Sequence, residues 1–176
     1  MAVLTICAGA FGALIKGNIR RLFSYLIVCH IGFMLGGIAL FTKVALMGVT
    51  FYLLHDIMVK TNMFLIAGLI RQLRGTMDMS RLGGLYKEYP KISLLIAIVL
   101  FSLVGIPPLS GFWPKIYLFQ ESFAQHQYFF VGALIFGSFV TLYVIANMWA
   151  KVFWQDAPDP HILEDKFAPL PLYRKI

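Results

Sequence analysis

The sequence predicts an all-α fold, a polytopic transmembrane helix bundle of about five spans with one helix broken within the membrane. Hydrophobic residues make up 60% of its 176 residues and charged residues only 13%, and the mean hydropathy is +0.79. Soluble domains contain about 45–50% apolar and about 25% charged residues. The composition therefore excludes a soluble enzyme domain, a disordered tail and a disulfide scaffold. The net charge of +7 is not gathered on a polar domain, which argues against a nucleic-acid binder.

Three apolar segments open the chain, and each is a candidate for a membrane span, which needs about 20 mostly apolar residues. Residues 2–15 form a short segment that ends before a polar linker. Residues 22–41 contain no formal charge, and residues 44–70 carry Asp56 and Lys60. We expect one helix in each segment.

The second half of the chain adds two more spans. Residues 71–91 are polar, residues 92–123 are a long apolar region, and residues 128–154 form the last span. The remaining residues, 155–176, are polar and proline-rich and cannot span a membrane. We expect residues 1–154 to form the transmembrane bundle and the tail to lie in the cytoplasm.

The apolar region 92–123 is too long for one straight span. As a continuous helix it would measure roughly 48 Å at ~1.5 Å per residue, whereas the hydrocarbon core is ~30 Å thick. Its middle has the sequence GIPPLSG, which contains Gly105, Pro107, Pro108 and Gly111. Prolines remove helical hydrogen bonds, and the two pieces on either side are each too short to span alone. We therefore expect a single spanning helix that is broken at 105–111. Broken backbone at that depth must be buried by protein or lined by water.

The basic residues are distributed unevenly between the two faces that a five-span topology creates. One face receives 12 of the 15 Lys and Arg residues, and the positive-inside rule predicts that it is cytoplasmic. Lys43 lies on the other face, and Lys60 and Lys115 lie within spans. We expect a multi-pass protein of the cell inner membrane. The 12 residues are Lys16, Arg20, Arg21, Arg71, Arg74, Arg81, Lys87, Lys91, Lys151, Lys166, Arg174 and Lys175.

Five ionisable side chains within the spans are the candidates for chemistry. They are Lys115, Lys60, Asp56, His55 and His30. Placing a lysine near the bilayer centre costs ~2.5–3.5 kcal/mol on insertion scales, so such residues face a partner or a water-filled path. Burial also disfavours the charged form of a lysine, which helps it to release a proton. These properties are typical of a proton relay.

Each candidate also has a structural interpretation. Asp56 and Lys60 are spaced i, i+4 and so share one helix face, where they form either a structural ion pair or a charge switch in a proton path. Lys115 follows Gly111 by four residues, so it is either a relay near backbone groups freed at the break or a lysine that snorkels to the surface. His55 and His30 are each either titrating groups or hydrogen-bonded packing residues.

Several stretches resemble the proton-pumping antiporter-like membrane proteins of respiratory complex I and of Mrp-type cation/proton antiporters. They are NIRRLFSYLIVCHIGFMLGG, FYLLHDIMVKTNMFLIAGLI, RLGGLYKEYP, LVGIPPLSGFWPK and ANMWAKVFW, and they extend over roughly residues 8 to 156. The pattern H-D-x-x-V-K-T-N-x-F-L and the last stretch are similar to the form found in the D-type subunits of Mrp antiporters.

The resemblance implies a role for each candidate residue. Lys115 matches the family's lysine on the broken helix, which is thought to be the proton exit or terminal relay site. Lys60 matches a lysine of the central polar axis. Asp56 stands where many relatives carry histidine, with His55 before it, and His30 stands where relatives carry Ser, Gln or His.

The resemblance also implies a function. We expect a membrane subunit of a multisubunit monovalent cation/proton (Na⁺/H⁺) antiporter, which is a secondary transporter rather than an enzyme and needs no cofactor or metal. The alternatives are a proton-pumping membrane subunit of an NADH-quinone oxidoreductase or membrane-bound hydrogenase, and a non-conducting structural remnant. The partners would be other antiporter subunits, protons and monovalent cations.

Full-length members of this superfamily have about fourteen spans built from two inverted repeats, and this chain resembles only the second. We therefore expect a fragment, a truncated product, or a split subunit whose companion chain carries the first repeat.

Overall fold

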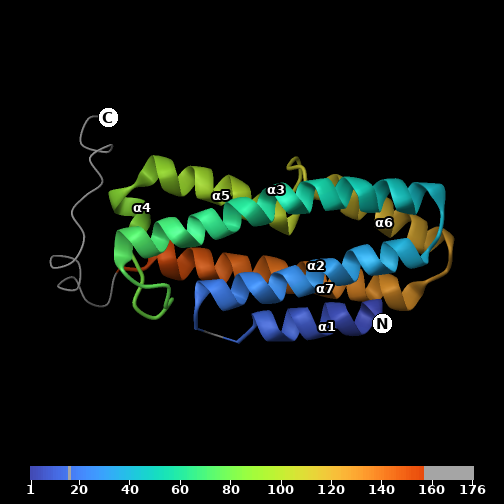
Figure 1. Cartoon of the computed structure of the whole chain (residues 1–176), viewed down its shortest axis with the longest axis horizontal. Helices are drawn as coiled ribbons and strands as arrows, with labels where there is room; N and C mark the ends of the chain where they lie inside the picture. The colour runs from blue at the N-terminus through green and yellow to red at the C-terminus, as the bar shows by residue number, and fades with distance from the viewer. Residues whose placement is uncertain (16, 157–176) are drawn as a thin grey trace.

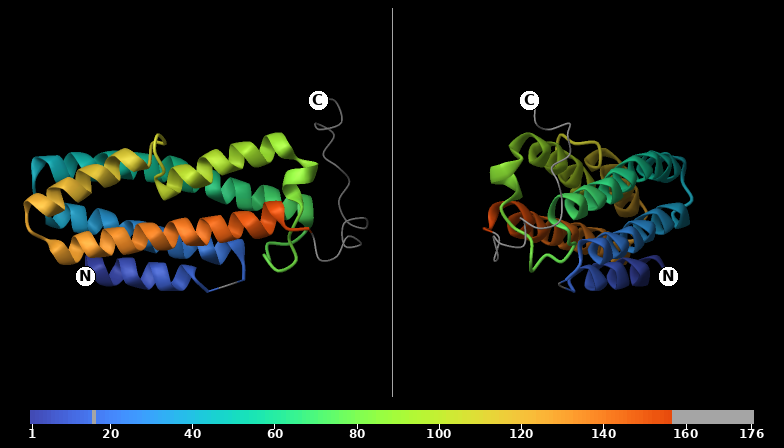
Figure 2. Two further views of the ribbon diagram at one scale, coloured as in Figure 1. Left: turned by 180° about the vertical axis from the view of Figure 1, so that it is seen from behind. Right: turned by 60° about the vertical axis from the view of Figure 1, so that its left-hand side comes forward.

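The computed structural model describes residues 1–15 and 17–156, and all of the regular elements in these residues are helices (Figure 1). The predicted all-α class is confirmed. The elements are α1 (Ala2–Ala13), α2 (Ile19–Ala39), α3 (Lys43–Arg74), α4 (Leu85–Glu88), α5 (Pro90–Val104), α6 (Phe112–Ala124), α7 (Tyr128–Trp149) and the π-helical turn η1 (Ala150–Trp154). The long helices lie side by side along the long axis of the molecule, with α1 beside α2 (Figures 1 and 2).

Among residues 1–15 and 17–156, three helices are long and apolar enough to cross a membrane: α2, α3, and α7 with its continuation η1. α1 and α5 are shorter apolar helices. Many large apolar side chains of α3 face outward, including Leu54, Met58 and Leu65. An outer surface of this kind suits a hydrocarbon solvent, and the chain is a membrane-embedded protein.

Capping residues set the helix ends, which differ from the expected spans by a few residues. α2 begins at Ile19 because the Asn18 side chain accepts a hydrogen bond from the Arg20 amide at 2.9 Å, a typical N-cap. α3 extends to Arg74, beyond the expected end at residue 70, and stops at Gly75, whose φ of 70° is left-handed. Glycine tolerates this conformation at a helix C-terminus.

The polar stretch 71–91 contains structure that the sequence analysis did not predict. α4 lies within it, and α5 starts at Pro90, where a missing amide proton is harmless. Buried Arg74 donates from Nη2 to the Gly83 carbonyl and to Glu88 Oε1, both at 2.9 Å. Buried apolar side chains such as Leu85 anchor the segment to the core. Four residues are too few for a periodic pattern, so only these tertiary contacts reveal α4.

The predicted interruption of the long apolar region is present. α5 ends at Val104, and Gly105 caps it with a φ of 83°. α6 begins at Phe112. The two helices lie almost end to end, with the connecting segment looping away from their shared axis (Figure 2).

The segments that were expected on the basic face meet at one end of the bundle. The Ile19 amide donates to the Met77 carbonyl and the Met79 amide donates to the Gly17 carbonyl, both at 3.0 Å. The Gly84 amide donates to the Gln155 carbonyl at 2.6 Å. The helix connections at 40–42 and 125–127 lie at the opposite end (Figure 1). Lys16 and the tail from residue 157 onward lie outside the described residues, so the placement of the tail stays a prediction.

We predict that single cysteines at Ser80 and His126 react with a membrane-impermeant maleimide from opposite sides. Ser80 lies in the loop between α3 and α4, His126 lies in the connection between α6 and α7, and both are exposed. Cys7 and Cys29 must first be replaced by alanine. Labelling of right-side-out and inverted vesicles makes the test, and His126→Cys should be the position that reacts from outside. Reaction of both positions from one side would contradict the five-span topology.

Candidate functional site

The buried face of α3 carries an ion pair. Lys60 Nζ pairs with Asp56 Oδ2, and the two side chains are only 14% and 5% exposed. The pair predicted from the i, i+4 spacing is therefore confirmed. A buried pair of this kind contributes little stability by itself, but loss of one member leaves an uncompensated charge.

His30 of α2 joins this pair from across the helix interface. Its Nδ1 lies 3.2 Å from Asp56 Oδ1, a contact in which the carboxylate accepts, and His30 is fully buried. The Asp56 carboxylate thus bridges Lys60 on its own helix and His30 on the neighbouring helix. From the sequence His30 had no charged neighbour on its span, and its partner 26 residues away follows only from the packing of α2 against α3.

His55 serves a different part of the site, because adjacent helix positions point about 100° apart. Its Nδ1 lies 3.0 Å from Ser110 Oγ, which lies 3.0 Å from Ser102 Oγ. The contact with Ser110 makes His55 a hydrogen-bonded residue, one of the two roles expected for it, and a titrating role stays a prediction. Ser102 and Ser110 were not predicted, although both stand within or beside the glycine- and proline-rich sequence that marked the break.

Lys115 reaches back to the broken backbone, as its position predicted. Its Nζ donates to the Val104 carbonyl at 2.7 Å. That carbonyl ends α5 and has no helical amide to accept from, because the chain turns away at Gly105. Nζ also lies 5.5 Å from the centroid of the Phe33 ring, within the range of a cation–π contact. Lys115 therefore does not snorkel outward along α6.

The break is packed closely enough to require glycine. A Cβ at Gly111 would lie 2.0 Å from the Ser102 carbonyl oxygen and 2.8 Å from His55 Nε2. Pro107 and Pro108 lie in the exposed part of the connection. Of the helix-break residues predicted from the sequence, Gly111 thus packs closely against α3 and α5, whereas the two prolines face outward.

Two buried polar atoms at the site lack a hydrogen-bond partner within the described part of the chain, one on the predicted His30 and one on Tyr52, which was not predicted. They are His30 Nε2 and the Tyr52 hydroxyl. Their rings are neighbours, with centroids 5.8 Å apart. Buried polar atoms are satisfied by protein or by ordered water in most structures. Tyr52 was not predicted, because a tyrosine in an apolar run is most simply a packing residue.

The candidate site brings together side chains that can bind and release protons. It places two histidines, a carboxylate and two lysines along α2, α3 and the broken helix. Residues 1–15 and 17–156 contain no group of three or more His, Cys, Asp or Glu side chains that could hold a metal ion.

The chain is similar in sequence to a known family of membrane proteins. A family model described as NADH:quinone oxidoreductase/Mrp antiporter, TM, matches residues 1–141. The D-type subunit of the Na(+)/H(+) antiporter of Bacillus subtilis is 32% identical over 164 residues, which cover 92% of this chain and 33% of the relative. Its counterpart from Alkalihalophilus pseudofirmus is 34% identical over 154 residues, or 88% of this chain and 31% of the relative. The chain spans about a third of the length of the curated relatives that it matches.

Solved structures show the same fold. The structure of the Mrp complex from Dietzia sp. DQ12-45-1b matches with a TM-score of 0.83 and 29% identity over 97% of this chain and 33% of that chain. Respiratory complex I from Thermus thermophilus with bound aureothin matches with a TM-score of 0.71 and 25% identity over 91% of this chain and 38% of that chain.

We predict that Asp56→Ala destabilises the protein more than Asp56→Ala combined with Lys60→Met. The single change leaves Lys60 buried without its carboxylate, at a cost of roughly 3–5 kcal/mol, whereas the double change removes both charges. Thermal unfolding of the purified protein in detergent measures the difference. Asp156→Ala is the control, because it breaks the exposed Lys87–Asp156 pair and should change stability by less than about 1 kcal/mol. Equal damage from the single and double changes would show that the two buried residues are not coupled.

We predict that Gly111→Ala destabilises the protein by about 1–3 kcal/mol, a typical cost of overpacking. The added methyl group collides with the Ser102 carbonyl and with His55. Gly132→Ala on α7 is the matched control, because a Cβ there meets no atom within 4 Å and alanine favours the helix. The same unfolding assay compares them, and a Gly111 variant as stable as the Gly132 variant would refute the close packing.

Proposed function

The chain belongs to the NADH:quinone oxidoreductase/Mrp antiporter transmembrane family, and on this premise we propose that it acts in a multisubunit monovalent cation/proton antiporter of the Mrp type, as the D-type subunit or part of it. Its task there is to provide part of a transmembrane proton path through buried lysines. The Na(+)/H(+) antiporter relatives from Bacillus subtilis and Alkalihalophilus pseudofirmus support this assignment. The observation that carries it is the hydrogen bond from Lys115 Nζ to the Val104 carbonyl at the break. Lys115 also faces the ring of Phe33, which stacks on His30 of the His30–Asp56–Lys60 cluster.

The two lysines are held in different ways, and we infer that this difference lets a proton move. The charge of Lys60 is balanced by the Asp56 carboxylate. Among the described residues, the charge of Lys115 meets only the Val104 carbonyl dipole and the face of Phe33. Protonated Lys115 therefore has no negatively charged group in direct contact in this part of the chain. Whether the protonated or the neutral form of Lys115 is favoured then depends on the charges of residues farther away.

Asp56 is suited to act as a charge switch between its two partners. When His30 carries a proton on both ring nitrogens, Asp56 faces two cations and binds each less strongly. When His30 is neutral, the carboxylate is free to balance Lys60 alone. Protonation of His30 would thereby change the field that Lys60 and Lys115 experience, because electrostatic interactions are strong in a medium of low dielectric constant.

The break supplies polar groups in an otherwise apolar helix. The Ser102–Ser110–His55 chain lies beside it, and a hydroxyl group can accept one hydrogen bond while it donates another, so it can pass a proton along a chain by taking up one proton as it releases its own. We propose that this chain and the Val104 carbonyl line the route by which Lys115 exchanges its proton with water. The remaining half of the path, the transported cation and the other subunits would come from the rest of the complex.

A proton-pumping subunit of a complex I-like oxidoreductase is the second candidate, because complex I of Thermus thermophilus shares the fold. The same residues would move protons there, and only the partners would differ. Purification of the intact complex from its native membrane, followed by mass spectrometry of its subunits, separates the two. Antiporter subunits would support the first proposal, and quinone- or hydrogen-oxidising subunits would support the second.

We further propose that the chain lies in the cell inner membrane with its basic end in the cytoplasm. The end formed by the loop between α3 and α4 and by η1 carries most of the described Lys and Arg residues, and Lys43 begins α3 at the other end.

We predict that both Lys115→Arg and Lys115→Met abolish cation-dependent proton flux while the complex still assembles. Arginine keeps the charge but remains protonated at any physiological pH, and methionine keeps much of the stem without a proton to give. Quenching of a pH-sensitive dye in proteoliposomes that contain the whole complex, with and without added Na⁺, measures the flux.

Lys43→Arg and Lys43→Met are the matched controls, because Lys43 lies at the start of α3, away from the buried cluster, and both should leave the flux unchanged. Near-normal flux with Lys115→Arg would mean that a fixed charge is sufficient, and the relay role of Lys115 would then be wrong.

A further inference from the structure

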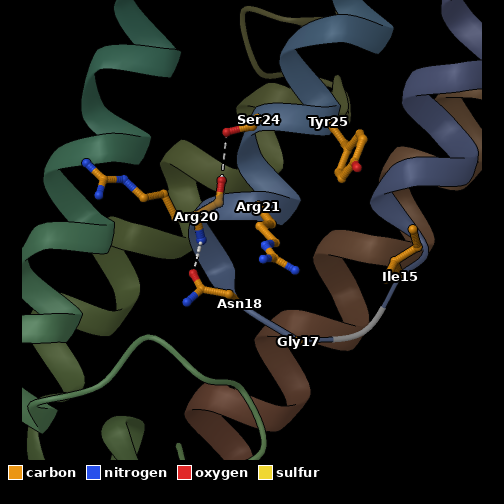
Figure 3. A pocket seen from close by; sticks show the side chains of 7 residues that line it. All are labelled: Ile15, Gly17, Asn18, Arg20, Arg21, Ser24 and Tyr25. Carbon is orange, nitrogen blue, oxygen red and sulfur yellow. Dashed lines mark hydrogen bonds between the residues drawn. The ribbon is translucent and has the colours of Figure 1, made fainter.

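A pocket of about 510 Å³ with two arginines in its lining lies at the start of α2, away from the residues proposed to transfer protons. It is lined by Ile15, Gly17, Asn18, Arg20, Arg21, Ser24 and Tyr25 (Figure 3). We propose that this pocket binds the phosphate headgroup of an anionic phospholipid, chiefly through Arg21.

The charge of the pocket favours an anion. Within the described residues, neither Arg20 nor Arg21 lies within 4 Å of a carboxylate. The Arg21 side chain extends to the side of Gly17 and Ile15, and that of Arg20 extends to the opposite side of α2 (Figure 3). Arg21 can therefore contact a phosphate directly, with the planar donor geometry that suits phosphate oxygens, whereas Arg20 adds positive charge from a distance.

The side chains of Asn18 and Ser24 are bonded to the Arg20 backbone and not to the Arg21 guanidinium. The Arg21 guanidinium can therefore donate its hydrogen bonds to a ligand. The Asn18 side chain accepts from the Arg20 amide at 2.9 Å, and the Ser24 hydroxyl donates to the Arg20 carbonyl at 3.0 Å. Asp78 pairs with Asn18 through its backbone, but its carboxylate accepts from the Ser80 amide and hydroxyl. These hydrogen bonds hold the pKa of Asp78 below its usual range. The Asp78 carboxylate is thus bound to Ser80 and pairs with neither Arg20 nor Arg21.

The surroundings favour a lipid over a free phosphate ion. The pocket lies at the end of a membrane helix, the depth at which headgroups occur, and Tyr25 is the kind of side chain found at that interface. A second pocket of about 100 Å³ shares Ile15 with the first, and Leu14, Leu22 and Tyr143 help to line it. Arg21 lies close to the apolar side chains of Ile15, Leu14 and Leu22, and this combination suits an amphiphile, which has a charged headgroup and apolar chains. The pocket also lies at the basic end of the bundle, where anionic lipids are attracted.

Native mass spectrometry of the purified full chain tests the proposal with two lipids that share their acyl chains, dioleoylphosphatidylglycerol and dioleoylphosphatidylcholine. The wild type should retain the anionic lipid in preference to the zwitterionic one. Arg21→Gln should reduce that retention by about fivefold, as expected for one basic residue near a membrane surface, and Arg20→Gln should reduce it by less. Arg21→Lys, which keeps the charge but loses the planar donors, should fall between the wild type and Arg21→Gln.

Arg81→Gln is the matched control, because Arg81 is exposed at the same end of the bundle but does not line the pocket, and it should retain the lipid like the wild type. Inorganic phosphate in excess should not displace the lipid, whose acyl chains also bind. Equal retention by wild type and the two glutamine variants would overturn the proposal, whatever else covers the pocket in the complex. Displacement by phosphate, or equal retention of the two lipids, would overturn the assignment to an anionic lipid.

Discussion

The structure depends on one constraint, which is that the backbone polar groups released where the α5–α6 helix breaks must find partners inside an apolar bundle. Two helix ends meet there, and each leaves amides or carbonyls without helical partners. The segment satisfies part of this need itself, since the Ile106 amide donates to the Phe101 carbonyl and the Leu109 amide donates to the Ile106 carbonyl. Lys115 satisfies the Val104 carbonyl. The lysine proposed to carry the proton is therefore also part of the support of the fold.

Both the break and the ion-pair cluster are in contact with side chains of α3. His55 and Asp56 are adjacent on α3, yet the first bonds Ser110 at the break and the second bonds His30 and Lys60. A rotation or shift of α3 would act on both sets of contacts together. The coupling proposed between the two lysines would then need no direct contact, because α3 carries Asp56 and also packs against the break through His55. A mechanical link of this kind would complement the proposed electrostatic one and would depend on close packing at Gly111.

The candidate site could be predicted only in part from the sequence. The Asp56–Lys60 pair and the approach of Lys115 to the break follow from helical periodicity and from short sequence separation, and the structure contains both. The contact of His30 with Asp56 and the bond of His55 to Ser110 join residues 26 and 55 positions apart. Such pairs depend on how helices rotate and pack, and apolar helices offer many rotations of similar hydrophobic energy. Tyr52, Ser102 and Ser110 were missed for the same reason, since each is unremarkable until its neighbours are known.

The sequence by itself determined the all-helical class, the approximate length of the long helices and the position of the break. These are consequences of hydropathy, proline and glycine, which act locally and need no partner. It also showed that ionisable residues such as Asp56 and Lys60 lie within the apolar segments. Only the tertiary structure decided which polar atoms meet, that Arg74 is buried, that the stretch 71–91 contains the short helix α4, and that the pocket of Arg21 lies beside a second pocket. Those features arise between segments far apart in the chain, where side-chain packing and hydrogen bonding, rather than local preference, set the outcome.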